Sequence, residues 1–342
     1  MAIRPSRSTR GPSSLLVAAL TLTVAACGGT DAADTSTGEA APQIPADQLT
    51  RTADPYARGY TDADFPRITE LANGVYAYEQ LRSAGDEKFT TVTMFVVTDD
   101  GVLVADGQGS VEETQRLVDA IGGITDRPIT TVVVGSDHGD HTAGNSVFPE
   151  GAEFIAHPTS AAALEAMAAG AREGAPPVRL ATQLVEDRTV LNMGGRAIEV
   201  LFLGRAHTGG DLVVYLPDEK IMFMSEAFLH RVFPAMRSAY PSEWVAMIEA
   251  AQAMDVDVYV PGHGFVDHPS ILEAELELFQ GAIRVVIDEA TRLHAEGYDL
   301  VDAQAQALFG DLETWTLRSS QGDRALQQVY AEINGELGSP AR

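Results

Sequence analysis

The sequence predicts an α+β fold in which two mixed β-sheets pack face to face, with helices on the outer sides. Short apolar runs rich in β-branched residues, a pattern typical of buried strands, occur in two groups, at 75–156 and 197–260. Helical patterns follow the strands of each group and can cover the sheets. With 342 residues, 45% of them hydrophobic, and no clear interruption after the first fifty, the chain is expected to form one large domain.

The amino-terminal segment has the features of an export signal. Arg4, Arg7 and Arg10 form a basic front without acidic residues, and a short apolar run at 15–26 ends in small residues before Cys27. This segment resembles a bacterial lipoprotein signal. We therefore expect residues 1–26 to be removed and Cys27 to carry lipid, which would anchor the protein in the cell envelope, at the periplasmic or extracytoplasmic face. The alternative is an ordinary signal peptide with a chance cysteine.

Composition limits the partners of the chain. The formal net charge of −26 disfavours nucleic acid, because an acidic surface repels phosphate backbones. A small-molecule substrate is expected instead. Residues 27–55 are rich in small and polar side chains and are expected to form a flexible tether, followed by the folded domain at 56–342, which includes a helical C-terminal extension.

The first group of strands begins with an antiparallel arrangement. Runs at 75–81 and 90–98 flank a turn-rich tip at 83–86, and a third strand at 102–105 follows the turn 99–101. Ser110, with Glu113 three residues later, then forms a capping box before a helix whose apolar residues share one face. Strands at 131–134 and 153–156 and a helix at 161–169 complete this group.

The second group repeats this organisation. Its expected strands are 197–203, 212–216, 221–224 and 256–260, and the second and third of them are joined by the turn Pro217-Asp218-Glu219. Helical patterns occupy 243–254 and 270–295, and the chain after about residue 300 is also expected to be helical.

The apolar strand at 131–134 ends abruptly in polar residues of the metal-ligand type. Ser136, His138, Asp140 and His141 follow it closely, and such a cluster cannot share a core with the strand unless a charge such as that of a divalent metal neutralises it. His207, Glu226 and His263 each follow another apolar strand. If these strand ends meet at one edge, His138, Asp140, His141, His207, Glu226 and His263 share a cleft whose chemistry suits zinc.

Taken together, these motifs resemble the metallo-β-lactamase superfamily of hydrolases over roughly residues 68–266. The resemblance implies an αββα sandwich with two neighbouring metal sites at one edge of the sheets. It assigns Ser136, His138 and His207 to the first site and Asp140, His141 and His263 to the second. Glu226 stands where the family usually places a bridging aspartate, and Asp106 stands where a family residue supports the metal loop as a hydrogen-bond acceptor.

Two residues depart from that pattern. Ser136 occupies a position where the family has histidine, and a neutral hydroxyl is a poor zinc ligand. Glu226 is one methylene longer than aspartate and would reach a metal with different geometry. We therefore expect one zinc to bind tightly at Asp140, His141 and His263, with Glu226 as a further candidate ligand, and a second to bind weakly or not at all.

The metal suggests the chemistry. Zinc lowers the pKa of a bound water from about 16 to about 7, which provides a hydroxide nucleophile at neutral pH. Asp140 is the expected catalytic residue, orienting that water and moving its proton, while His138 and His207 are candidate donors to the developing oxyanion. The expected activity is hydrolysis of a small ester, lactone, thioester or lactam. The alternative is a catalytically weak or inactive binding lipoprotein on a decayed hydrolase fold.

Substrate contacts are expected from two segments, the tip at 83–86 and the loop at 228–240. Within that loop, Arg231 or Arg237 could hold a substrate carboxylate, but a solvated arginine is the default expectation. His230 is expected to be solvated, with a position facing the cleft as the alternative.

Overall fold

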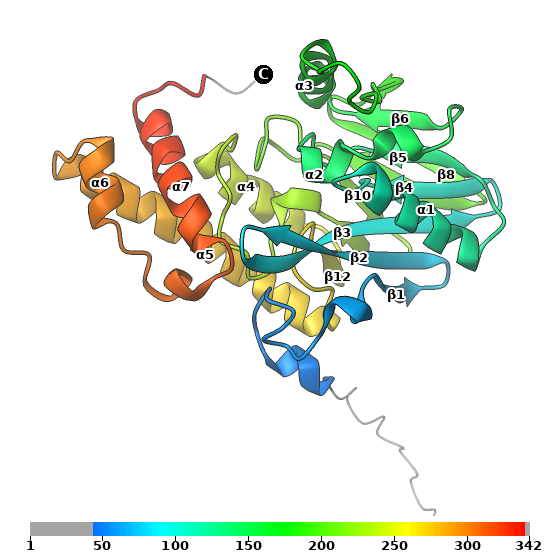
Figure 1. Cartoon of the computed structure of the whole chain (residues 1–342), viewed down its shortest axis with the longest axis horizontal. Helices are drawn as coiled ribbons and strands as arrows, with labels where there is room; N and C mark the ends of the chain where they lie inside the picture. Colours follow the sequence, from blue (N-terminus) through cyan, green and yellow to red (C-terminus); the bar gives the residue numbers. More distant parts are fainter. Residues whose placement is uncertain (1–43, 339–342) are drawn as a thin grey trace, which may run out of the picture. The chain divides into compact units, whose positions relative to one another are not determined.

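The computed structural model describes residues 44–338, and its two β-sheets lie face to face with helices on both outer sides (Figure 1). This confirms the αββα sandwich expected from the sequence. The expected signal segment 1–26 and Cys27 lie outside the described residues. Among the described helices, none combines the length and the apolar composition needed to cross a membrane.

The first sheet has seven strands and is mixed. Their order follows the sequence: β1 (Arg67–Ala72), β2 (Val75–Ala84), β3 (Glu87–Thr98), β4 (Gly101–Ala105), β5 (Ile129–Val133), β6 (Glu153–Ala156) and β7 (Gln183–Leu184). Strands β1 to β4 pair antiparallel, as expected for β2 to β4, and β4 to β7 pair parallel. Parallel pairing places the carboxyl end of β5 beside that of β4.

The second sheet has five strands. Their spatial order is β12 (Val258–Val260), β11 (Ile221–Phe223), β10 (Val213–Leu216), β9 (Arg196–Leu201) and β8 (Arg188–Met193). Strand β10 pairs antiparallel with both β9 and β11, while β11 pairs parallel with β12. Strands β9, β11 and β12 therefore run in one direction, and their carboxyl ends lie at the same edge of the sheet.

Alternating side chains divide the apolar residues of the first sheet between two cores. Met94 and Val96 belong to the core between the sheets, whereas Phe95 faces the outer helices α1 (Val111–Ile124) and α3 (Pro158–Ala169). Ser110 Oγ accepts a hydrogen bond from the backbone N–H of Glu113 at 3.1 Å, so Ser110 caps the amino terminus of α1. The helix thus begins where the sequence predicts.

The outer face of the second sheet carries a layer of helices. These are α4 (Pro241–Gln252), α5 (Pro269–Ala295), α6 (Leu300–Gln306) and α7 (Arg318–Ile333). In this layer α5 packs on β12, α4 and α7 pack against α5, and α6 packs against α7. Trp244 of α4 and Phe279 of α5 are fully buried and lie edge to face, with ring centroids 5.5 Å apart. Short helical turns complete the structure: η1 (Ala46–Leu49), η2 (Asp62–Asp64), α2 (Gly139–Thr142), η3 (Asn145–Val147), η4 (Ser225–Ala227) and η5 (Gly310–Thr314).

The expected tether is corrected for its described part, residues 44–55. Ala53 is fully buried in the core, and the side chain of Gln48 accepts a hydrogen bond from the backbone N–H of His268 at 2.8 Å. The small and polar side chains that suggested a tether also pack well against an existing surface. This segment therefore belongs to the folded domain.

Candidate metal centre

Four strand ends position the candidate ligands. His207, Glu226 and His263 follow β9, β11 and β12, whose carboxyl ends share one edge of the second sheet. Ser136, His138, Asp140 and His141 follow β5 of the first sheet. Because the two sheets are packed together, these segments meet, and the structure brings all six expected ligands into two adjacent clusters.

The loop that carries His263 is held between two other segments. The backbone N–H of Val92 in β3 donates to the carbonyl of Gly262 at 2.8 Å, and the N–H of His230 donates to the carbonyl of His263 at 2.9 Å. A Cβ atom on Gly262 would lie 2.8 Å from the backbone nitrogen of Glu226, so only glycine allows these two ligand loops to approach so closely.

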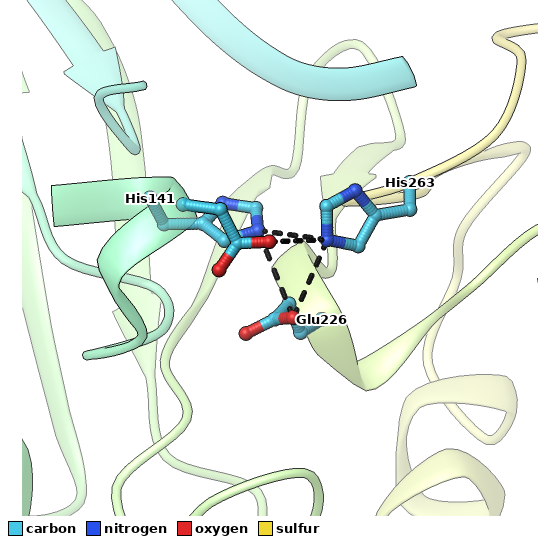
Figure 2. Close-up of side chains that lie close together, drawn as sticks. His141, Glu226 and His263 are labelled. Atoms are coloured by element: carbon cyan, nitrogen blue, oxygen red, sulfur yellow. Dashed lines mark hydrogen bonds and ion pairs between the residues drawn. The ribbon is translucent and has the colours of Figure 1, made fainter. Parts of the chain in front are cut away.

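The first cluster contains four candidate metal ligands, which are Asp140, His141, Glu226 and His263. Figure 2 shows the side chains of His141, Glu226 and His263 pointing toward one another. His263 Nε2 lies 3.2 Å from Asp140 Oδ2 and 3.3 Å from Glu226 Oε1. It also lies 3.3 Å from His141 Nε2. In a tetrahedral zinc site, ligand atoms about 2.0 Å from the metal are about 3.3 Å apart. The four ligand atoms therefore fit around a single zinc-sized cation.

The opposite ring atoms of both histidines are already engaged. His263 Nδ1 donates to the carbonyl of Thr90 at 2.9 Å, and His141 Nδ1 lies 3.0 Å from Asp106 Oδ2. In neutral rings these contacts leave the proton on Nδ1, so the lone pairs of both Nε2 atoms face each other and the two carboxylates. Such an arrangement is stabilised by a positive charge at its centre, which either a metal ion or a proton on Nε2 supplies, so the four residues are suited to hold a metal.

The second cluster contains three donors, from His138, His207 and Glu226. His138 Nδ1 lies 3.1 Å from Glu226 Oε2, and His207 Nε2 lies 3.1 Å from Glu226 Oε1. Ser136, at the expected third-ligand position, instead donates its hydroxyl to Glu226 Oε2 at 2.5 Å. Glu226 is therefore shared by both clusters, and the second has fewer ligands of its own.

Asp106 connects the loops around the centre. Its left-handed backbone, with φ of 64°, turns the chain after β4 so that the side chain is buried under the ligand loops. Asp106 Oδ1 accepts a hydrogen bond from the N–H of Gly135 at 2.6 Å, and Oδ2 accepts one from Ser225 Oγ in addition to facing His141. The carboxylate thus fixes the β5 loop, the β11 loop and one imidazole together.

Electrostatics make the whole centre attractive to positive charge. Burial lowers the pKa of His263, but Asp140 and Glu226 outweigh burial and raise it to about 9. Burial likewise lowers the pKa of His138, but Glu226 raises it to about 9. Conversely, the surrounding histidines hold the pKa of Glu226 well below its usual range, although burial acts in the opposite direction. The carboxylates thus favour a bound proton or metal ion at His138 and His263, whereas burial lowers the pKa of His207.

A cavity of about 190 Å³ opens beside the centre, and His138, Asp140, His207, Glu226 and His263 contribute to its lining. Arg82 of β2 also lines it, with its Nε 3.7 Å from Asp140 Oδ2. Both segments expected to contact substrate contribute: Ser83 and Ala84 from the hairpin tip, and Arg237 from the loop at 228–240.

Two expectations about the loop at 228–240 are corrected. Arg231 forms a two-pronged ion pair with Glu275, at 2.5 and 2.8 Å, and is not among the residues that line the cavity. His230 is fully buried, with Nδ1 2.8 Å from the carbonyl of Phe265, so it is not solvated. The ion pair of Arg231 and the burial of His230 both result from packing against segments distant in the sequence. The local sequence does not indicate such packing.

Sequence reasoning missed Thr90, Arg82 and Arg324 as contributors to the site. Thr90 acts through its backbone carbonyl, which any residue provides. Arg82 is adjacent to the predicted hairpin tip, but no local signal directs it towards Asp140. Arg324 lies on α7, about sixty residues beyond the last ligand, and only the tertiary fold brings it to the cavity.

Comparison with known families agrees with this geometry. The family model described as the metallo-beta-lactamase superfamily matches residues 87–263, slightly more than half of the chain. The match begins with β3 and ends at the last candidate ligand, His263.

Individual relatives are distant. The chain is 25% identical over 202 residues to the 2,4-dinitroanisole O-demethylase subunit alpha of Nocardioides sp. (strain JS1661), covering 57% of this chain and 59% of that subunit. It is 23% identical over 218 residues to the metallo-beta-lactamase type 2 of Bacillus sp. (strain 170), covering 62% of this chain and 82% of the lactamase. A solved metallo-beta-lactamase from Pontibacter korlensis superposes with a TM-score of 0.53 at 24% identity, over 63% of this chain and 98% of that one.

Proposed function

The chain belongs to the metallo-beta-lactamase superfamily, and on that basis we propose that it is a zinc-dependent hydrolase of a small ester, lactone, thioester or lactam. The observation that carries this proposal is the four-donor cluster. The separations from His263 to the other three ligand atoms are 3.2 to 3.3 Å, and His141 Nε2 lies 3.9 Å from Glu226 Oε1, which suits one tetrahedral metal ion.

We propose that one zinc binds tightly, held by Asp140, His141, Glu226 and His263. The three-donor cluster would hold a second zinc weakly or not at all, because it shares Glu226 with the first. In addition, Glu226 Oε2 already accepts a hydrogen bond from the Ser136 hydroxyl. A poor third ligand and a shared carboxylate thus both favour unequal sites.

A zinc ion bound there would activate water for attack on a carbonyl at neutral pH. Asp140 is the best-placed residue to handle the proton. Its side chain is 22% exposed, against 5% for Glu226, and it lines the cavity in which a substrate would lie. Asp140 would therefore orient the attacking water, accept its proton and pass that proton to the leaving group.

His138 and His207 would stabilise the negative charge that develops on the substrate. Both line the cavity, and His207 Nε2 lies 2.9 Å from His138 Nδ1. The raised pKa of His138 favours its protonated form at neutral pH, which can donate a hydrogen bond to an oxyanion.

The test is a substrate panel containing a cephalosporin, a lactone, a thioester and a phosphodiester, each assayed with added zinc and with a chelator. Zinc-dependent turnover of a carbonyl substrate, abolished by the chelator and by Asp140→Asn, would support the proposal. Turnover that is insensitive to the chelator would contradict it.

A second candidate is a binding protein that retains the fold with little activity. Ser136 and Glu226 favour it, because both depart from the family's usual ligands. The same panel discriminates the two functions: absence of chelator-sensitive turnover, together with tight zinc binding, would favour the binding protein.

We also propose that the protein is exported and anchored by lipid on Cys27, with a small molecule rather than nucleic acid as its partner. The basic, apolar and small-residue pattern before Cys27 supports this location. Fractionation of cells that produce the full chain is the test: the protein should sediment with membranes, and Cys27→Ser should release it. Equal release of both forms would reject the lipid anchor.

A further inference from the structure

Three arginines from three separate elements line the cavity beside the metal centre. They are Arg82 from β2, Arg237 from the loop after β11 and Arg324 from α7. The chain as a whole has 49 acidic and only 23 basic residues, so this local excess of guanidinium groups runs against its composition. The carboxylates in the same lining, Asp140 and Glu226, both belong to the proposed metal ligands.

The arginines differ in their partners. Arg82 lies 3.7 Å from Asp140 and 3.9 Å from Glu113, so its charge is partly balanced. Within residues 44–338, neither Arg237 nor Arg324 forms an ion pair or a side-chain hydrogen bond, and both side chains are exposed. Two arginines that no direct ion pair holds thus line one cavity, although the charge of Arg237 also acts on Asp137.

Helix α7, which carries Arg324, is fixed to the wall of the cavity near both ends. The N–H of Leu317, just before the helix, donates to Glu87 at 2.7 Å, and the N–H of Phe233 donates to the carbonyl of Thr316 at 2.8 Å. Further along, Gln328 Nε2 donates to the carbonyl of Ala239 at 2.6 Å. Because these bonds connect α7 to the hairpin and to the loop at 228–240, the helix holds Arg324 at the cavity.

The remaining lining is largely apolar. Phe89, Leu229, Val232 and Leu317 contribute to it. A ligand that fills this cavity would therefore bring a short apolar group beside a negative charge, with the group to be cleaved near the metal centre.

We propose that Arg237 and Arg324 form an anion subsite, and that the substrate carries an oxyanion, such as a carboxylate or a sulfonate, on a short apolar body. This inference rests on the proposed function, because it assigns a substrate class to the same site. Guanidinium groups bind planar and tetrahedral oxyanions through charge-assisted hydrogen bonds. The helix α7 that supplies Arg324 lies outside the residues matched by the family model, so this part of the subsite depends on the chain's own C-terminal extension.

The test is calorimetric binding to the zinc-loaded full chain, which needs no turnover. The probes are 4-phenylbutanoate, 4-phenylbutane-1-sulfonate and the neutral 4-phenylbutanamide. We expect both anions to bind at least about tenfold more tightly than the amide, and Arg237→Gln and Arg324→Gln each to reduce that ratio about fivefold. The matched control is Arg116→Gln, since Arg116 is an exposed arginine on α1 that does not line the cavity.

The ratio of anion to amide affinity decides the proposal. A ratio that falls equally in Arg116→Gln, or that is unchanged in both cavity variants, would overturn it, because the anion would then be held by general electrostatics or by the metal. Carboxylate binding without sulfonate binding would support the subsite and restrict it to planar anions. A protein that shows the expected ratios but hydrolyses nothing in the substrate panel would retain the subsite while losing the hydrolase assignment.

Discussion

The Ser136 hydroxyl lies 2.5 Å from Glu226 Oε2, at the point where the two donor clusters meet. Glu226 Oε1 faces His207, His141 and His263, so the carboxylate contacts both clusters through its two oxygens. The short serine side chain leaves room for the longer glutamate, and its hydrogen bond fixes the rotation of the carboxylate. The two residues that depart from the family pattern are thus in direct contact and act as a pair.

This pairing predicts how metal stoichiometry responds to substitution. A histidine at position 136 would compete with Glu226 for the same space, whereas shortening the acid by one methylene would make room for it. Ser136→His combined with Glu226→Asp should therefore raise tightly bound zinc from about one to about two ions per chain, and neither single variant should do so. Elemental analysis after dialysis measures this. Two tight zinc ions in the unaltered chain or in Ser136→His alone would contradict the pairing.

Catalysis should depend far more on Asp140 than on Ser136. Asparagine at position 140 keeps the size of the side chain but cannot accept a proton, so the turnover number of Asp140→Asn should fall at least about a hundredfold. Ser136→Ala removes one hydrogen bond to Glu226 and should lower turnover less than about tenfold. Both variants are assayed at saturating zinc, and their metal content is measured, so that poor loading is not mistaken for a slow reaction. Equal losses would count against the proton-transfer role.

Removal of the metal should destabilise the fold, because the centre connects loops from both sheets. At a free zinc concentration about a hundred times the dissociation constant, binding adds about 2.7 kcal/mol to the free energy of unfolding. A chelator should therefore lower the midpoint of thermal unfolding by roughly 5 °C. The shift should be much smaller in His263→Asn and unchanged in His294→Asn, since His294 lies on α5 and is not among the donors. An equal shift in all three proteins would show that the chelator acts elsewhere.

Much of the fold could be predicted because its signals are local. The continuous apolar run through Met94, Phe95 and Val96 indicates a strand covered on both sides, and the β-branched run before Ser136 indicates another. Strand β1 went unpredicted because its residues alternate between exposed and half-buried, and β7 because two residues give no pattern. Tertiary pairing, rather than sequence preference, defines these edge strands.

Some features of the candidate site could also be predicted from the sequence, and others could not. The ligand residues could be anticipated because each follows an apolar strand, and parallel strands bring such ends together. The contact between Ser136 and Glu226 could not, because they are ninety residues apart and each was visible only as a separate departure from the family pattern. The same holds for the pair of Arg231 and Glu275, whose contact depends on how α5 packs against the loop at 228–240.

Stability should also depend on pH through Glu79, a fully buried residue of β2. Burial raises the pKa of Glu79 to about 7, although Arg67, Arg58 and the hydrogen bond from the N–H of Val266 act in the opposite direction. In the unfolded chain the group would titrate near its ordinary value of 4.5. Between these two values the folded state binds more protons than the unfolded state, so the contribution of Glu79 becomes less favourable as the pH rises from 4.5 to 7 and is constant above 7.

Glu79→Gln should remove this dependence, because glutamine keeps an acceptor for the N–H of Val266 but does not ionise. Relative to the unaltered chain, the variant should gain on the order of 3 kcal/mol in free energy of unfolding as the pH is raised through this range. Urea denaturation at a series of pH values measures the difference. Glu112→Gln, which changes an exposed glutamate on α1, is the control and should show a nearly constant difference. The free energy of unfolding of Glu79→Gln minus that of the unaltered chain should grow as the pH rises. If this difference is constant from pH 5 to pH 8, or shrinks, the folded protein does not retain a proton on Glu79.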